Sequence, residues 1–186
     1  LSISAIYIQR ILDIQVTWNI QADGTVDIAM DVKRNPIFPM LPRFGLRLFL
    51  PKEMKDVTYY GLGPVESYMD KRRASWHGEF SSPVTDLHED YIRPQENGSH
   101  YDCDYVTLSS NAGHLLPERK TSLTAVSGQT FSFNASVYTE EELTNKAHHY
   151  ELEECGSTVL CLDYRQNGIG SNSCGPQLIE KYRLDE

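Results

Sequence analysis

The stretch VTWNIQADGTVDIAMDV, residues 16–32, decides the fold class because apolar and polar side chains alternate on both sides of a turn. Every second residue from Val16 to Ile20 is apolar, and the same period of two runs from Val26 to Val32. Asp23-Gly24 lies between these runs and is the preferred chemistry of a tight β-hairpin turn. The pattern therefore predicts an antiparallel hairpin with one buried face and one solvated face.

Five further segments have the composition or alternation of strands. They are residues 46–50, 57–60, 105–108, 131–138 and 158–163. Residues 64–101 are rich in Pro, Gly, His and Tyr, and we expect them to form a long irregular segment. The chain is therefore predicted to be all-β and antiparallel, with strands spaced as in a sandwich.

One short helix is expected near residues 140–147. Thr139-Glu-Glu-Glu142 matches a capping box, in which the Thr139 hydroxyl accepts the Glu142 amide and the Glu142 carboxylate reaches back. Acidic residues in a first turn also suit the helix dipole. No internal repeat or domain boundary is visible, so residues 1–186 are predicted to form a single domain.

The composition is that of a globular, acidic chain. Its 186 residues include 17 Lys and Arg against 26 Asp and Glu, for a formal net charge of −9, and 40% are hydrophobic. This balance argues against a nucleic-acid partner, which requires a clustered basic face. No apolar run approaches the roughly 20 residues of a membrane span, so no membrane partner is expected. The first residue is not Met and no signal-peptide pattern follows it, so we expect a fragment cut from a longer chain.

The cysteines and histidines are not spaced along the sequence as the ligands of a metal site usually are. The cysteines are Cys103, Cys155, Cys161 and Cys174. The histidines are His77, His88, His100, His114, His148 and His149. No close C-x-x-C pair occurs, so free thiols in a reducing compartment are the preferred interpretation. Packing or surface placement is the better interpretation of the histidines, and no metal site is expected in this chain.

Three carboxylates in Gly- and Pro-framed segments are candidates for acid–base chemistry: Glu66, Asp70 and Glu96. A retaining glycosidase needs two carboxyl groups about 5–5.5 Å apart, a distance that spacing along the chain does not reveal. Carboxylates in such segments more often accept backbone amide bonds and fix loops, and we prefer that interpretation. Residues 167–176, NGIGSNSCGP, offer glycines and serines to a ligand, although a plain turn explains the composition equally well.

Four ordered blocks carry a specific resemblance: Gly61–Asp70, Tyr91–Gly98, Phe131–Leu143 and Leu162–Pro176. They resemble the signature blocks of the C-terminal small-chain domain (domain 5) of bacterial lacZ-type β-galactosidases, glycoside hydrolase family 2. The resemblance implies an antiparallel β-supersandwich of the galactose mutarotase-like type, here truncated at both ends. The family's catalytic carboxylates and magnesium ligands belong to a separate barrel domain. The isolated chain is therefore expected to be inactive and to hold no cofactor, with magnesium in the catalytic domain.

The resemblance also implies a supporting role toward the substrate. In the family this domain covers one side of the active-site mouth, and its last loop approaches bound sugar. Cys174 aligns with a position that carries a substrate-stacking Trp in one branch, so Cys174, Ser173 and Asn172 are the expected substrate-binding residues. A Cys gives a smaller and softer contact than a Trp, which predicts a roomier leaving-group side.

The implied reaction is retaining hydrolysis of terminal β-D-galactosides such as lactose. The implied partners are the substrate, the catalytic barrel domain or large subunit, and further copies in a homo-oligomer. The bacterial cytoplasm is the expected location, with the periplasm as the alternative. Two rival hypotheses are a stand-alone carbohydrate-binding module and a mutarotase-like epimerase, and the latter needs a His and a Glu in one cleft.

Overall fold

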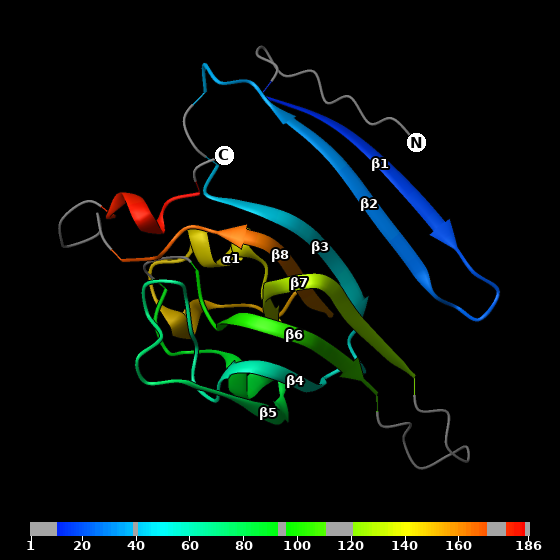
Figure 1. Ribbon diagram of the computed structural model, residues 1–186. Helices are drawn as coiled ribbons and strands as arrows, with labels where there is room; N and C mark the ends of the chain where they lie inside the picture. The colour runs from blue at the N-terminus through cyan, green and yellow to red at the C-terminus, as the bar shows by residue number, and fades with distance from the viewer. Residues whose placement is uncertain (1–10, 39–40, 93–95, 111–120, 171–177, 185–186) are drawn as a thin grey trace. The chain divides into compact units, whose positions relative to one another are not determined.

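The computed structural model describes residues 11–38, 41–92, 96–110, 121–170 and 178–184 (Figure 1). The chain divides into two compact units, Leu1–Met40 and Leu41–Glu186, which are described separately. Each unit contains one antiparallel sheet, of two and six strands respectively. The all-β, antiparallel class with one short α-helix is therefore confirmed.

The first unit contains the predicted hairpin. Strand β1 (Leu12–Ile20) pairs with β2 (Val26–Arg34), and Trp18 lies opposite Ile28. Gly24 in the turn has a φ of +93°, a left-handed conformation that glycine adopts without steric cost. The expected buried face is only partly covered, because Trp18 and Ile20 are 49% and 74% exposed. A two-stranded ribbon is a single layer, so it cannot bury its own apolar face.

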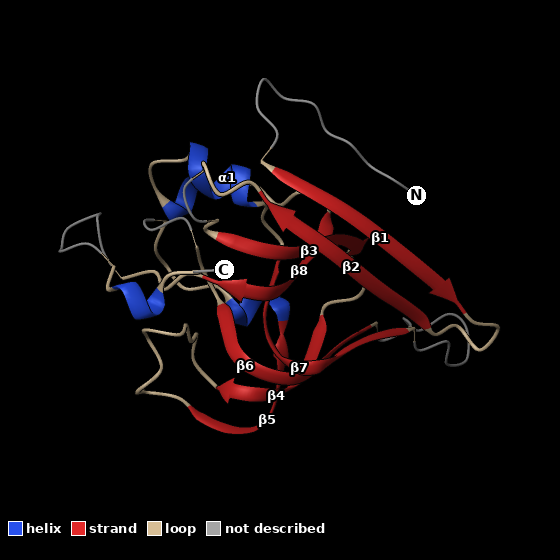
Figure 2. Ribbon diagram, turned by 45° about the horizontal axis from the view of Figure 1, so that its top comes forward, coloured by secondary structure: helices blue, strands red, loops and turns tan. Residues whose placement is uncertain are grey.

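The second unit is built on a six-stranded sheet with the strand order β3-β8-β7-β6-β4-β5. The strands are β3 (Arg43–Pro51), β4 (Asp56–Gly63), β5 (Trp76–Pro83), β6 (Ser99–Ser109), β7 (Ser122–Ser136) and β8 (Ser157–Gln166). Short 3-10 turns are η1 (Val84–Leu87), η2 (His149–Glu151) and η3 (Glu180–Tyr182). Figure 2 shows the six strands as a curved layer.

The core of this unit lies on one face of the curved sheet. It consists of alternate strand residues together with side chains from η1 and the β3–β4 connection, namely Met54, Val57, Tyr59, Val84, Leu87, Cys103, Val106, Leu108, Phe131, Phe133, Ala135 and Leu160. The strand residues among these apolar side chains come from β4, β6, β7 and β8, so burying them holds these four strands together. The period of two in the sequence is the direct consequence of this one-sided burial.

The prediction of an irregular segment over 64–101 is wrong in part. Residues Trp76–Pro83 form β5, and β6 already begins at Ser99. Among the described strands β5 pairs with β4 alone, as an edge strand, and a glycine at position 78 interrupts its alternation. Pairing with β4 imposes the strand conformation of β5 more than its own composition does. This explains why the sequence pattern did not predict a strand here.

Helix α1 (Glu140–Asn145) begins as predicted and ends two residues earlier. The Thr139 hydroxyl accepts the Glu142 amide at 3.1 Å, which confirms the N-cap. The expected return bond is absent among the described contacts, because the Glu142 carboxylate instead accepts the Glu153 amide at 2.9 Å. In the described part of the chain, no helix combines the length and apolar character needed to cross a lipid bilayer.

Candidate functional site

The loop that follows β8 is the candidate site, and the structure describes its two ends. Asn172, Ser173 and Cys174, the expected substrate-binding residues, lie outside the described residues. Their role therefore stays a prediction. The described ends are residues 167–170 and 178–184, and within them we call Asn167–Gly170 and Tyr182–Leu184 together the loop stem.

Asp70 fixes the first segment of the loop stem, Asn167–Gly170, through two hydrogen bonds. Its Oδ1 accepts the Ile169 amide at 3.1 Å and its Oδ2 accepts the Gly170 amide at 2.8 Å. A side chain at Gly168 would overlap the Asp70 carboxylate, so the glycine is required for this close approach. The preferred interpretation of Asp70 as a loop-fixing carboxylate is therefore confirmed.

Further hydrogen bonds join the two segments of the loop stem to each other. The Gly168 amide donates to the Tyr182 carbonyl at 2.9 Å, and the Leu184 amide donates to Oδ1 of Asn167. The Asn167 amide also donates to the Pro42 carbonyl at 2.8 Å, which fixes the stem to the start of β3. These hydrogen bonds join the two described ends of the loop to each other and to the start of β3.

Glu66 holds the segment that carries Asp70. Its side chain is 3% exposed and pairs with Lys71, while the Tyr91 hydroxyl donates to it at 2.7 Å and the Gly98 amide at 2.9 Å. Burial alone would raise the pKa of Glu66, but hydrogen bonds from Lys71, Tyr91 and Gly98 outweigh that effect and lower it. The block containing Tyr91 and Gly98 is thereby joined to the block containing Asp70, and Glu66 is a structural carboxylate as predicted.

Glu96 belongs to a separate ion-pair network centred on Arg43. The Arg43 guanidinium contacts Oε2 of Glu96 at 3.0 Å and both carboxylate oxygens of Asp163. Glu140 at the start of α1 lies 3.7 Å from the same guanidinium. Desolvation raises the pKa of Glu96 although Arg43 opposes that shift. Sequence reasoning missed Arg43 and Asp163, because nothing local marks two residues that meet across neighbouring strands.

The histidines in the described residues show no shared ligand site. His100 is 1% exposed, and its ring stacks on Phe133 at a centroid distance of 5.1 Å. Burial lowers the pKa of His100 to about 4, so this ring is neutral near pH 7. Among the described residues, no three His, Cys, Asp or Glu side chains lie together as metal ligands would.

The cysteines and the histidines are the remaining residues for which the sequence suggested a role. Cys103, Cys155 and Cys161 are free, as predicted, and Cys174 lies outside the described residues. No histidine lies among the described residues that line either of two clefts in the second unit. The epimerase hypothesis requires a His and a Glu together in one cleft, and neither of these two clefts supplies that pair.

The six-stranded sheet and the hydrogen-bonded ends of the loop after β8 define an antiparallel all-β domain. Residues 2–186 match the model of the family described as "Beta galactosidase small chain". The chain belongs to this beta-galactosidase small chain family.

Individual relatives agree with this assignment. The chain is 44% identical over 177 residues to a beta-galactosidase of Actinobacillus pleuropneumoniae and 46% identical over 170 residues to one of Staphylococcus xylosus. These matches cover 95% and 91% of the chain but 16% of each relative. A beta-galactosidase of Lactococcus lactis subsp. lactis is 36% identical over 90% of the chain, again across 16% of its length. The chain thus spans about a sixth of the length of these relatives.

Proposed function

We propose that this chain is the part of a β-galactosidase that forms one wall of the sugar-binding region and presents the 167–184 loop to the substrate. The whole enzyme would hydrolyse terminal β-D-galactosides such as lactose with retention. The remainder of the polypeptide, or a large subunit, supplies the catalytic carboxylates and the magnesium site. The proposal places the enzyme in glycoside hydrolase family 2 and this chain in the mutarotase-like supersandwich fold. The enzyme would assemble as a homo-oligomer and take part in lactose catabolism. Its location would be the bacterial cytoplasm, with the periplasm as the alternative.

The attachment of the loop stem to Asp70 is the observation that carries the proposal. A carboxylate that accepts two amides at 3.1 and 2.8 Å sets the direction in which the chain leaves Gly170. Asn172, the first of the expected substrate-binding residues, follows two positions later. A loop with a fixed base can place Ser173 and Cys174 reproducibly, which is what a substrate wall requires.

The test is the Asp70→Ala substitution in the full-length enzyme that contains this chain. Removing both acceptors should lower kcat/KM for lactose about tenfold, the equivalent of about 1.4 kcal/mol, because the loop loses its fixed base. Asp70→Asn keeps one carbonyl acceptor, so its kcat/KM for lactose should fall by less than that of Asp70→Ala. The loss should appear mainly in KM, since the substitution leaves the catalytic carboxylates in place.

Asp86→Ala is the matched control, because Asp86 is an exposed carboxylate in η1 that accepts a hydrogen bond from the neighbouring Thr85 hydroxyl. It should leave kcat/KM within about twofold of wild type. Thermal unfolding of each variant separates loop displacement from loss of the fold. The proposal is wrong if Asp70→Ala folds normally and hydrolyses both lactose and a nitrophenyl β-galactoside as fast as wild type does.

A further inference from the structure

Strand β5 forms one edge of the six-stranded sheet, as Figures 1 and 2 show. It pairs with β4 in an unbroken register that runs from Trp76 opposite Gly63 to Pro83 opposite Asp56. Among the described strands, none pairs with the other side of β5. Natural edge strands are commonly protected by lysines, bulges or prolines, whereas β5 carries no lysine or arginine and its one proline is its last residue. The backbone groups along this edge are therefore open to pairing with a further strand.

Trp76 and Phe80 form an aromatic pair on one face of β5. Their ring centroids lie 5.8 Å apart and the planes meet at 70°, an edge-to-face arrangement. A Cβ atom at Gly78, between them, would come within 3.2 Å of the Phe80 ring and 3.8 Å of the Trp76 ring, so both rings border the backbone of this glycine. Phe80 packs against the core, but Trp76 is 59% exposed. Aromatic side chains exposed in this way are enriched at protein interfaces.

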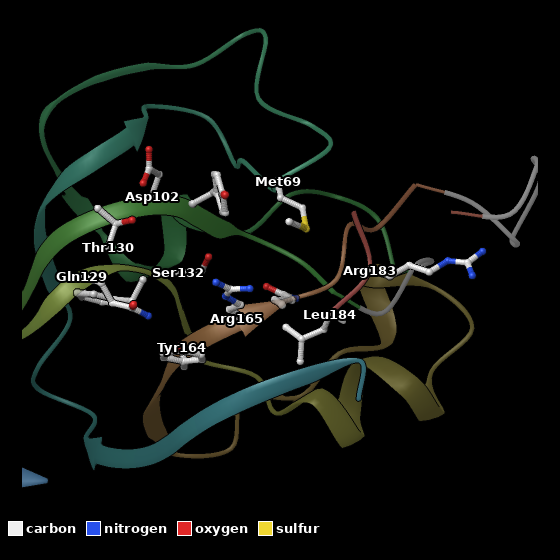
Figure 3. A pocket seen from close by; sticks show the side chains of 12 residues that line it. Met69, Asp102, Gln129, Thr130, Ser132, Tyr164, Arg165, Arg183 and Leu184 are labelled. Carbon is white, nitrogen blue, oxygen red and sulfur yellow. The ribbon is translucent and has the colours of Figure 1, made fainter. Parts of the chain in front are cut away.

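His77 and Glu79 belong to the opposite face of β5, because successive side chains of a strand alternate between its two faces. Nε2 of His77 lies 3.0 Å from Oδ2 of Asp102, whose carboxylate points away from Arg165 in Figure 3. The Tyr105 hydroxyl donates to Oε2 of Glu79 at 2.5 Å. Neither contact uses Nδ1 of His77 or Oε1 of Glu79. Both side chains are therefore held beside the open edge, each with a polar atom that these contacts do not use.

We propose that the β5 edges of two copies of this chain pair antiparallel about a two-fold axis at Gly78. This axis places Trp76 of one copy opposite Phe80 of the second copy, and His77 opposite Glu79 of the second copy, each twice by symmetry. The aromatic side chains then gather over the two glycines on one face of the joined sheet. Opposite charges meet on the other face when His77 is protonated. The inference rests on the homo-oligomer of the proposed function and names the surface through which two copies meet.

Moving the two-fold axis by one residue in either direction removes this complementarity. An axis at Glu79 places two carboxylates opposite each other and sets Trp76 opposite Ser82, so like charges repel and the aromatic pair is lost. An axis at His77 places two imidazoles opposite each other and sets Trp76 opposite Gly78. Of these registers, the one centred on Gly78 joins rings to rings and opposite charges to each other. This self-complementarity favours a second copy of the chain as the occupant of the edge.

Disulfide cross-linking of the full-length enzyme tests the register. Directly opposite residues of antiparallel strands have Cα atoms about 4.5–5.5 Å apart, a separation that a disulfide can span. Gly78→Cys should therefore form a disulfide between two copies in oxidised glutathione, seen on a non-reducing gel and assigned to position 78 by peptide mass spectrometry. Ser81→Cys is the matched control, because Ser81 is exposed on the same strand and its two copies would lie about 20 Å apart. Gly78→Cys should cross-link about tenfold faster than Ser81→Cys.

Further variants keep the test independent of the side chain added at Gly78. The double variant His77→Cys/Glu79→Cys places each cysteine opposite the other position of the second copy, so it should cross-link. Either single variant should not, because its two copies lie diagonally, about 7–8 Å apart. In the Gly78→Cys background, Trp76→Ala removes both aromatic pairs between the copies and should slow cross-linking about tenfold. Trp76→Phe keeps a ring at this position and should stay within about threefold of the parent.

Three results would each overturn the proposal. They are equal cross-linking of Gly78→Cys and Ser81→Cys, a double variant that cross-links no better than its single variants, and an unchanged rate after Trp76→Ala. A different segment of the enzyme paired with β5 would produce the first of these results. Cross-linking does not depend on lactose hydrolysis, so its failure leaves the lactose kinetics of Asp70→Ala untouched and the two proposals fail separately.

Discussion

Arg43 and Asp163 lie side by side on β3 and β8, with Nε of Arg43 3.0 Å from Oδ1 of Asp163 and Nη2 2.5 Å from Oδ2. The two residues are 120 positions apart in the chain. Asp163 is 2% exposed, and burial raises the pKa of its carboxyl despite the opposing effect of Arg43. The same contacts raise the pKa of Arg43, so the guanidinium stays charged and is the group that makes the buried carboxylate tolerable.

Substituting Arg43 should therefore cost far more stability than substituting a surface arginine. We expect Arg43→Ala to lower the free energy of unfolding by about 3–5 kcal/mol, since it leaves a buried carboxylate uncompensated. Arg47→Ala is the matched control, because Arg47 is more exposed and pairs with Glu140 and Glu141 near the surface. Its loss should stay below about 1 kcal/mol. Urea unfolding at pH 7 measures both values, and equal losses would contradict this account.

The pair also shows what sequence reasoning reaches and what it misses. The hairpin at Asp23-Gly24 and the cap at Thr139 were predictable, because their signals lie within a few residues of chain. The contact between Arg43 and Asp163 depends on the strand order, which no local pattern encodes. The edge strand β5 was missed for the same reason, since β4 rather than its own alternation specifies it.

For the candidate site too, the sequence predicted the role of some residues but not their hydrogen-bond partners. A loop-fixing role for Glu66 and Asp70 followed from their Gly- and Pro-framed segments. The donors could not be predicted, because Asp70 meets amides 99 and 100 positions later and Glu66 meets Gly98. The resemblance placed the relevant blocks in order along the chain, and the structure shows which atoms join them.

Glu66 should make the stability of the protein depend on pH in the acid range. Its pKa in the folded state is lowered, so the carboxylate stabilises the fold above the ordinary carboxyl pKa, and that contribution is lost as pH falls through the lowered value. Glu66→Gln should therefore cost about 2 kcal/mol at pH 7 and progressively less as the solution becomes more acidic. Glu53→Gln, at an exposed position, is the control. A loss that stays constant from pH 7 to pH 3 would show that the charge of Glu66 is unimportant.

His100 should add a second pH dependence at higher pH. Its pKa falls from an ordinary value near 6.5 to about 4 on burial, so the folded state binds fewer protons than the unfolded state between these values. The contribution of neutral His100 to the free energy of unfolding is complete above pH 6.5. It should fall by about 3 kcal/mol as the pH drops to 4. His100→Leu should flatten this part of the stability curve.

Phe133→Leu separates titration of His100 from packing around it. Phe133 stacks on the His100 ring, and its replacement should cost about 1–2 kcal/mol at every pH while the slope between pH 6.5 and 4 remains. Denaturant unfolding at closely spaced pH values measures the slope for each variant. An unchanged slope in His100→Leu would assign the acid sensitivity to other groups.

The contact between Asp70 and Gly168 permits a double-mutant test of the loop stem. The Cβ atom of Gly168→Ala would overlap the Asp70 carboxylate, so this substitution should displace the stem and lower kcat/KM for lactose as Asp70→Ala does. In the double variant the carboxylate is already absent, and Gly168→Ala should then cost little more. Gly128→Ala is the control, because nothing lies within 4 Å of the added Cβ. Full additivity of the two losses, measured from lactose kinetics of the full-length enzyme, would mean that Gly168 acts through a neighbour other than Asp70.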